Sequence, residues 1–390
     1  MDDEYFNLFR RSILKRFIIP LSFSLITIPF NLFAASTNTV TLKTNSLGYP
    51  YSKMFQVDVT FSQPIAGLYS SQVKVANGSI DSIIGSGTNY SMLVTPINPG
   101  EVDISILGNS VSSLTNTANK ESNLLKINAL DPLMRPSSNF NLDGWNLTMP
   151  LPLGNSSDAL MIKQPVLSGV ASANSGYTQA PYFSTDSTTG AMKFFAPLNG
   201  ATTDNSDYPR TELSEILNWK IANFASNEMI SSVRVNKIPP SKKIIIGQIH
   251  HKAVIDAYGK SVSAKPLLKI TYDLNKLDPN KQTCNGCVYI QIRTIPGSET
   301  FLKRVTLAKN IPLNQTFIYD VVLLKDGTLS VKVNNTSTLA KINTSTNNKL
   351  GWGMQDLYFK AGVYLLDNGT SSSDGGGVSM DSLQVSHNPK

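Results

Sequence analysis

Apolar and polar residues alternate with a period of two along much of the chain from residue 40 onward. This period places successive side chains on opposite faces of an extended backbone, so it predicts β-strands. Residues 55–61 (FQVDVTF) and 101–108 (EVDISILG) show it clearly, and turn-forming residues separate these segments from their neighbours. No long helical period of 3.6 residues competes with it. The pattern therefore predicts an all-β protein.

The chain of 390 residues is long enough for two domains with separate cores. Short strands at regular spacing predict a small β-sandwich over residues 36–130. A proline-marked connector follows at 131–139, and the second domain is expected at 140–390. The segment FSQPIAGL at 61–68, with the alternating runs after it, resembles the bacterial immunoglobulin-like domains that are often joined to secreted enzymes. The first domain is therefore interpreted as an immunoglobulin-like spacer or adhesive module.

The first 35 residues predict export. A basic region that ends at Arg16 is followed by an apolar run over residues 17–33 and then by three small residues, which is the layout of a secretory signal peptide. The apolar run is short and contains two prolines, which argues against a transmembrane anchor. Paired arginines before the run leave the general and the twin-arginine export routes open. We expect an extracellular or periplasmic protein without membrane contact after signal removal.

The two cysteines, Cys284 and Cys287, lie in the segment TCNGC. In an exported protein, two cysteines around an Asn-Gly turn predict a local disulfide that closes a hairpin. A zinc site would need further ligands, and a redox motif would be expected in a different fold.

The formal net charge is +7, from 34 basic and 27 acidic residues. This balance favours a polyanionic partner through long-range attraction. It does not identify the polyanion.

The segment 244–251 (IIIGQIHH) places an amide and an imidazole inside an otherwise apolar run. Residues two apart share one face of a strand, so Gln248 and His250 would face the same way. The same parity would put Ile244 and Ile246 on that face and His251 on the opposite one. A strand that should be buried thus shows two polar groups to one surface, which we interpret as the floor of a groove for an acidic sugar.

Three further segments of the second domain alternate in the same manner, at 208–215 (YPRTELSE), 287–293 (CVYIQIR) and 358–364 (YFKAGVY). Each offers an apolar face to a core and a polar, aromatic or basic face to another surface. Two antiparallel sheets, with the outer face of one sheet concave and polar, would satisfy all of these segments. The polar faces would carry Arg210, Glu212, Tyr289, Gln291, Arg293, Tyr358, Lys360 and Tyr364.

These residue types suit the removal of a proton next to a carboxylate. The guanidinium of Arg210 and the amide of Gln248 can bind a carboxylate through several donors. The imidazole of His250 and the phenol of Tyr364 can move protons. Glycoside hydrolysis would need two carboxyl groups at one bond, and Glu212 is the one clear acidic candidate, with pairing to a basic neighbour as its expected role.

Other sites are not indicated by the sequence. It has no phosphate-binding glycine loop, no cluster with metal-ligand spacing and no nucleophile-elbow serine. We expect no cofactor, no metal and no nucleic-acid partner.

Three segments in the same order along the chain, SDYPRTELSE at 206–215, QIH at 248–250 and YFKAGVY at 358–364, resemble the signature regions of the alginate lyases of polysaccharide lyase family seven. The segments PLNGATTDNSDYPR at 197–210 and WNLTMP at 145–150 resemble the same family. The resemblance spans about residues 140 to 387. It implies a β-jelly-roll sandwich and a metal-independent β-elimination of alginate.

The resemblance also implies a role for each matching residue. Arg210 and Gln248 would neutralise the uronate carboxylate in the +1 subsite. His250 would act as the base or assist it, and Tyr364 would be the acid, and also the base where the geometry is syn. Lys360 would contact the substrate from the groove floor. Further candidates for substrate binding on the polar faces are Glu212, Tyr289, Gln291, Arg293 and Tyr358.

Substrate preference is less well specified. Ser214 stands where the family commonly has a second arginine, and two leucines, Leu365 and Leu366, follow Tyr364 where a polar pair ending in Gln is common. In such enzymes an isoleucine between Gln and His accompanies action on guluronate blocks, so Ile249 favours guluronate. A non-catalytic protein that binds acidic polysaccharide and a lyase for another uronan such as glucuronan stay open, as does endo or exo action. We expect a monomer.

Overall fold

The computed structural model describes residues 37–170, 173–204, 206–252, 254–255, 261–262, 264–274, 285–346 and 351–389. The predicted signal peptide and Cys284 lie outside these ranges. β-Strands dominate the described part of the chain, which confirms the all-β class. None of its helices is long and apolar enough to cross a membrane.

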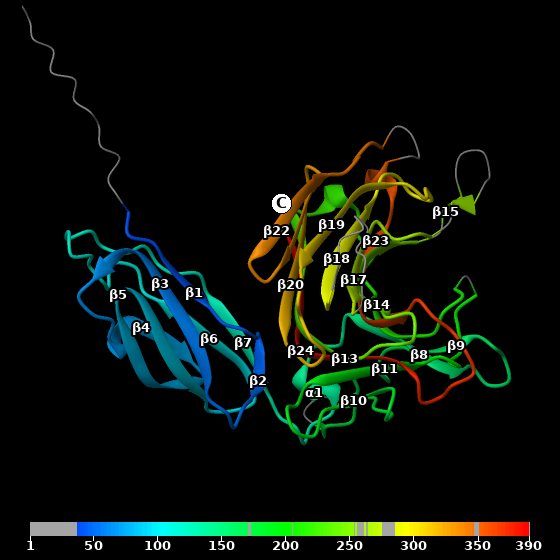
Figure 1. Cartoon of the computed structure of the whole chain (residues 1–390), viewed down its shortest axis with the longest axis horizontal. Coiled ribbons are helices and arrows are strands. Elements are labelled where there is room, and N and C mark those ends of the chain that lie inside the picture. Colours follow the sequence, from blue (N-terminus) through cyan, green and yellow to red (C-terminus); the bar gives the residue numbers. More distant parts are fainter. Residues whose placement is uncertain are drawn as a thin grey trace, which may run out of the picture. The chain divides into compact units, whose positions relative to one another are not determined.

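Residues 40–130 build two sheets around a core of their own (Figure 1). One sheet has the strand order β1-β3-β5 and the other has the order β2-β7-β6-β4. The alternating segment 55–61 falls within β3, and the segment 101–108 overlaps β6, which ends at Ile106; Val57, Met92 and Ile104 are fully buried in this core. The bounds are β1 Val40–Lys43, β2 Gly48–Pro50, β3 Phe55–Ile65, β4 Val73–Ala76, β5 Gly78–Pro96, β6 Gly100–Ile106 and β7 Leu125–Leu130.

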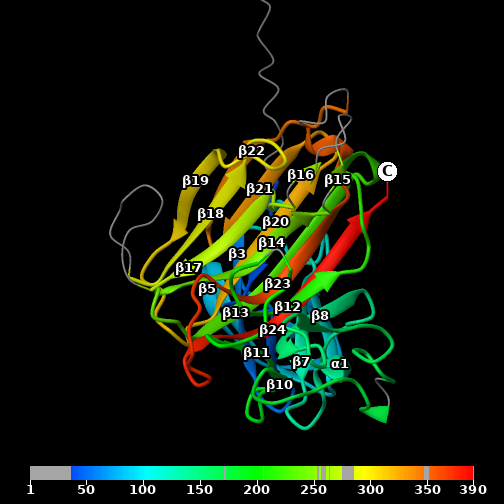
Figure 2. The same cartoon turned by 90° about the vertical axis from the view of Figure 1, so that its right-hand side faces the viewer.

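The rest of the described chain forms a sandwich of two larger antiparallel sheets, as the polar and apolar strand faces predicted. One sheet has eight strands in the order β19-β18-β17-β14-β23-β12-β8-β9, and Figure 2 shows β19 to β8 lying side by side. The other has seven strands in the order β10-β11-β24-β13-β20-β21-β22.

The strands of the eight-stranded sheet are β8 Trp145–Pro152, β9 Ala159–Ile162, β12 Arg210–Glu215, β14 Lys243–His251, β17 Leu268–Asp273, β18 Cys287–Arg293, β19 Phe301–Ala308 and β23 Leu357–Leu365. Those of the seven-stranded sheet are β10 Phe183–Thr185, β11 Met192–Pro197, β13 Ser226–Lys237, β20 Phe317–Leu324, β21 Thr328–Val333, β22 Thr336–Lys341 and β24 Gly375–Asn388. A short pair, β15 Val254–Ile255 and β16 Ser261–Val262, and the helix α1 Pro136–Asn139 complete the main elements.

The core between these two sheets takes one side chain in two from most strands. Leu213 of β12, Ile249 of β14 and Phe359 of β23 are all fully buried in it. Burial of one such side chain stabilises the fold by about 1.5–3 kcal/mol. The alternate residues of the same strands therefore face away from the core, and they include the polar residues predicted from the sequence.

The predicted parity of β14 is wrong at its first half. Ile244 and Ile246 lie in the core, where Ile244 packs against Gly376 of β24, and not on the face of Gln248 and His250. The reason is a β-bulge, because the register against both neighbouring strands shifts between Ile245 and Gly247. An extra residue at a bulge reverses the alternation, and a sequence pattern of consecutive isoleucines does not reveal it.

Parity holds in the second half of β14. His251 is fully buried and lies edge-on against the ring of Trp352, with the ring centroids 5.5 Å apart. His250 is partly exposed and contacts Tyr358 of β23 on the polar face. The two adjacent histidines thus face opposite ways, as the alternation predicted.

Gly362 allows β23 to follow two partners with different registers. It pairs with Glu212 of β12 without a shift, while the pairing of β23 with β14 is shifted by a bulge. Its φ is +141°, which is open to glycine and strained for other residues. A Cβ at this position would lie 2.5 Å from the carbonyl oxygen of Thr211 and 2.9 Å from Cα of Glu212.

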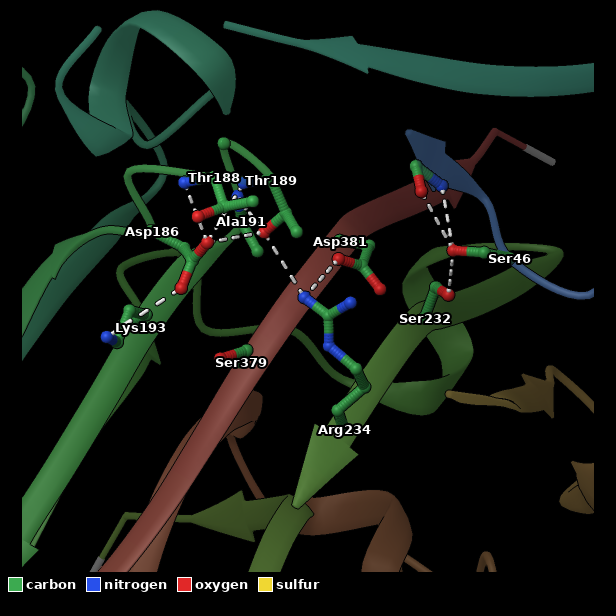
Figure 3. Close-up of polar contacts among 12 residues, drawn as sticks. Ser46, Asp186, Thr188, Thr189, Ala191, Lys193, Ser232, Arg234, Ser379 and Asp381 are labelled. Atoms are coloured by element: carbon green, nitrogen blue, oxygen red, sulfur yellow. Dashed lines mark hydrogen bonds and ion pairs between the residues drawn. The ribbon is translucent and has the colours of Figure 1, made fainter. Parts of the chain in front are cut away.

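A polar cluster on the seven-stranded sheet meets the loop before β2 (Figure 3). Arg234 of β13 pairs with Asp381 of β24 at 2.9 Å, and the hydroxyl groups of Ser46 and Ser232 lie 2.8 Å apart. Burial raises the pKa of Asp381 to about 6, against the opposing charge of Arg234. Gly48, two residues after Ser46, lies against the backbone of β24, since a Cβ at this position would lie 1.8 Å from the carbonyl oxygen of Asp381.

We expect Gly362→Ala to destabilise the protein by about 1–3 kcal/mol, because its positive φ is strained for alanine and the new methyl group meets the backbone of β12. Urea denaturation of the full chain measures the free energy of unfolding. Gly144→Ala is the matched control, since a Cβ at Gly144 has nothing within 4 Å. Equal stability of the two variants would contradict this account of the bulge.

Candidate active site

Backbone pairing aligns five polar residues in one row across the eight-stranded sheet. Each residue lies opposite the next on the neighbouring strand. Neighbouring strands are about 4.8 Å apart, so the row runs across the strands at roughly this spacing. The row lies on the face turned away from the core and consists of Ser214 on β12, Lys360 on β23, Gln248 on β14, Lys269 on β17 and Gln291 on β18.

Arg210 and Tyr364 are direct partners on β12 and β23. The guanidinium carbon of Arg210 lies 3.9 Å from the centroid of the Tyr364 ring, which is a cation–π contact. Arg210 Nη2 donates to Ser206 Oγ at 2.7 Å, and Ser206 Oγ lies 2.9 Å from the hydroxyl of Tyr364. Ser206, in the loop before β12, therefore holds Arg210 and Tyr364 together.

Glu212 joins three other members of the predicted site. Its side chain is 1% exposed, and Lys360 Nζ and Arg210 Nη1 lie 2.6 Å and 3.3 Å from Oε2. Gln248 Nε2 donates to Oε1 at 2.6 Å. Burial by itself would raise the pKa of Glu212, but the charges of Lys360 and Arg210, with these hydrogen bonds, hold it below its ordinary value. The structure thus confirms the expected pairing of Glu212 with basic neighbours.

The cluster around Glu212 carries a net positive charge, because two cations share one carboxylate. Burial lowers the pKa of Lys360 to about 8, against the pull of Glu212 and with the repulsion of Arg210. A second anion near Arg210 and Lys360 would relieve this imbalance. The cluster is therefore suited to receive a carboxylate.

His250 is held through one of its ring nitrogens. Nδ1 lies 2.9 Å and 3.0 Å from the backbone oxygen and nitrogen of His251 and 3.2 Å from the hydroxyl of Tyr358. Burial, and next the charge of Lys360, lowers the pKa of His250 well below 6.5. Burial also raises the pKa of Tyr358 to about 12. At neutral pH the imidazole is therefore neutral and able to accept a proton, while Tyr358 keeps its own.

The predicted residues of β18 differ in their surroundings. Tyr289 is 6% exposed and Gln291 is partly exposed on the polar face. Arg293 is buried, and its Nε donates to the carbonyl oxygen of Pro266 at 3.1 Å. Arg293 also pairs with Glu299 at 3.7 Å, so its observed contacts anchor neighbouring loops. The roles of Tyr289, Gln291 and Arg293 in substrate binding stay predictions. The disulfide between Cys287, which is buried, and Cys284, which lies outside the described residues, also stays a prediction.

Two residues of the polar face were not singled out from the sequence. Ser206 connects Arg210 to Tyr364, and a serine in a turn carries no pattern that would reveal such a contact. Lys269 lies in LLKITYD, where polar and apolar residues alternate as in the other strands. The same parity argument could have identified Lys269.

The arrangement offers donors for a carboxylate beside two groups that can move protons. Arg210 and Lys360 supply positive charge, while His250 and Tyr364 supply an imidazole and a phenol on neighbouring strands of the same face. Within the described ranges, no group of three or more His, Cys, Asp or Glu side chains is arranged to hold a metal ion.

Comparison with known proteins identifies relatives of one kind. A family model described as alginate lyase matches residues 140–387. An alginate lyase of Klebsiella pneumoniae is 27% identical over 271 residues, which cover 59% of this chain and 83% of the relative.

Solved structures agree with the family match. The crystal structure of an alginate lyase of Pseudomonas aeruginosa is similar with 32% identity and a TM-score of 0.51, over 63% of this chain and 99% of that one. The structure of a member of polysaccharide lyase family 7 is similar with 28% identity and a TM-score of 0.51, over 66% of this chain and 100% of that one. A variant of that enzyme, with one histidine changed to asparagine and one tyrosine to phenylalanine, was solved in complex with the substrate GGMG. It is similar with 27% identity and a TM-score of 0.52, over 66% of this chain and 99% of that one.

The family match covers well over half of the chain and includes each strand that carries the polar row. This protein therefore belongs to the alginate lyase family.

Proposed function

We propose that this protein cleaves the 4-O-glycosidic bond of alginate by β-elimination and prefers blocks that contain guluronate. The observation that carries the proposal is the net cationic cluster of Arg210, Lys360 and Glu212 beside a neutral imidazole and a phenol. The substrate complex of a relative with an altered histidine and tyrosine supports it, because His250 and Tyr364 are the residue types replaced there.

The first task of the site is to bind the carboxylate of the reacting uronate. Arg210 and Gln248 would donate hydrogen bonds to it, and Lys360 would add positive charge. These groups stabilise the negative charge that develops on the carboxylate when the neighbouring C5 loses its proton. Glu212 does not take part in the proton transfers and keeps the three donors in place.

The second task is the paired proton transfer. Neutral His250 takes the C5 proton, and the electrons of the C5–H bond form a double bond between C4 and C5. The C4–O4 bond breaks, and Tyr364 donates its hydroxyl proton to the leaving O4. Where the C5 hydrogen and O4 lie on the same side of the sugar, Tyr364 takes the C5 proton as well. The products are a shortened chain and an unsaturated uronate at the new non-reducing end.

The guluronate preference rests on Ile249. Its side chain is fully buried in the core, so it does not reach the polar face. An effect of this residue on preference would act through the backbone positions of Gln248 and His250, which flank it.

We also infer that residues 1–35 direct export, to the periplasm or outside the cell, and that the mature protein is a monomer. Residues 36–130, with their separate core, would be an immunoglobulin-like spacer, joined by 131–139 to a catalytic domain at 140–390. The pattern of strands supports the division into domains, and the signal-peptide layout supports export.

Incubation of the purified chain with alginate should produce near-ultraviolet absorbance from the new double bond, with the fastest rise on guluronate blocks. Mannuronate blocks and glucuronan are tested side by side. No absorbance on any alginate block would refute the lyase, and binding without product would favour a non-catalytic polysaccharide-binding protein. The fastest rise on glucuronan would indicate a lyase for that uronan.

Replacement of either proton-transfer residue should lower kcat at least about 100-fold, since general acid and base catalysis contribute this much or more. The variants are His250→Asn and Tyr364→Phe, with kcat measured on alginate and folding checked by thermal melting. Tyr182→Phe, which removes a hydroxyl remote from the polar row, is the control. Substantial activity of Tyr364→Phe would exclude its role as the acid.

The acidic limb of kcat/KM should lie well below pH 6.5. His250 acts in its neutral form, which persists above its lowered pKa and is lost only as the pH falls through that value. We therefore expect a level kcat/KM from neutral pH down to 6.5, with a decline in more acidic buffer. An acidic limb at or above 6.5 would show that the base is not the imidazole of His250.

A further inference from the structure

Lys269 is a cation of the polar face that has no anionic partner in the described part of the chain. Lys360 pairs with Glu212, and both Arg293 and Lys265 pair with Glu299. Lys269 makes no ion pair or side-chain hydrogen bond with the described residues. Burial, together with repulsion from Arg293, Arg210 and Lys265, lowers its pKa to about 8, and Glu212 opposes this weakly.

The register places Lys269 directly beside Gln248, one of the residues proposed to bind the reacting carboxylate. It lies opposite Gln248 on one side and opposite Gln291 on the other. Its neighbours along β17, Leu268 and Ile270, are in the core, so Lys269 faces the polar side. An amide, a cation and an amide therefore follow one another in a row, one strand spacing of about 4.8 Å apart.

We propose that Lys269 binds the carboxylate of a second uronate, in the subsite next to the reacting sugar on the β17 side. The inference rests on the proposed function, because the reacting uronate is taken to lie at Gln248 and Arg210. A polyuronate that crosses the strands presents one carboxylate per sugar. The amides of Gln248 and Gln291 flank Lys269 and can donate to the same ligand.

The chemistry of an unpaired, partly buried ammonium supports this role. Such a group has lost part of its hydration, and no anion among the described residues offsets that loss. A carboxylate from the ligand would supply the missing partner, and charge-assisted hydrogen bonds of this kind are stronger than neutral ones.

A feature of this chain makes the position of Lys269 important. Ser214 occupies the place on the row beside Lys360 on β12, where the family resemblance led us to expect an arginine. The two cations of the row are Lys360 on β23 and Lys269 on β17. Contacts to the second carboxylate would accordingly lie on the β17 side of the reacting sugar.

The test uses Lys269→Gln and Lys269→Arg in the full chain. We expect the glutamine variant to raise KM for alginate about tenfold with kcat changed less than twofold, and the arginine variant to restore most of the loss. The dissociation constant of a guluronate oligosaccharide, measured by calorimetry in the His250→Asn background, should rise by a similar factor. Lys332→Gln is the matched control, because Lys332 is exposed on β21 of the other sheet.

Thermal melting separates binding from a structural role. Removal of an unpaired, partly buried cation should leave the melting temperature of Lys269→Gln unchanged or raise it. A lower melting temperature with unchanged KM would overturn the proposal, and so would an unchanged KM in an active, stable variant.

The lyase assay and the oligosaccharide-binding measurement distinguish failure of the proposed function from failure of the role of Lys269. If the unmodified chain forms no unsaturated product, the proposed function fails, and oligosaccharide binding still tests Lys269. Weaker binding by Lys269→Gln would then support the carboxylate site, while no binding by the unmodified chain would overturn both.

Discussion

One buried carboxylate, that of Glu212, organises the polar face of the eight-stranded sheet. It accepts contacts from three strands at once, through Arg210 of its own strand, Lys360 of β23 and Gln248 of β14. Removal of one partner of such a buried charge cluster typically costs about 3–5 kcal/mol, because the others are left unpaired. The same contacts restrict the side chains that would meet a substrate carboxylate. Stability and preorganisation of the site therefore depend on one residue.

The cluster in turn depends on irregular backbone. Gly362 at φ +141° lets β23 pair regularly with β12 and out of step with β14. The bulge near Ile245 of β14 places Ile244 and Ile246 in the core and leaves Gln248 and His250 on the opposite face. On the C-terminal side of the bulge, Gln248 pairs with Lys360 of β23 and with Lys269 of β17, so the polar residues of these strands share one row. Bulges next to an active site are a common means of directing particular side chains.

Much of the fold could be predicted because its pattern is local. Alternation with a period of two predicted the strands and the sandwich, and it placed Gln248 and His250 on one face and His251 on the other. The same rule failed at Ile244 and Ile246, where a bulge reversed the parity. It also could not show that Arg293 is buried in contacts with neighbouring loops, because those contacts depend on the path of distant backbone.

The sequence by itself determined which residue types are present and which of them share a face within one strand. That was sufficient to predict a carboxylate-binding, proton-moving site built from Arg210, Gln248, His250 and Tyr364. The tertiary structure decided how the strands align, and therefore that Ser206 joins Arg210 to Tyr364, that Glu212 balances two cations, and that Lys269 has no anionic partner among the described residues. The physical reason is that register arises from backbone hydrogen bonds and bulges between strands far apart in the chain, while side-chain alternation reports on one strand at a time.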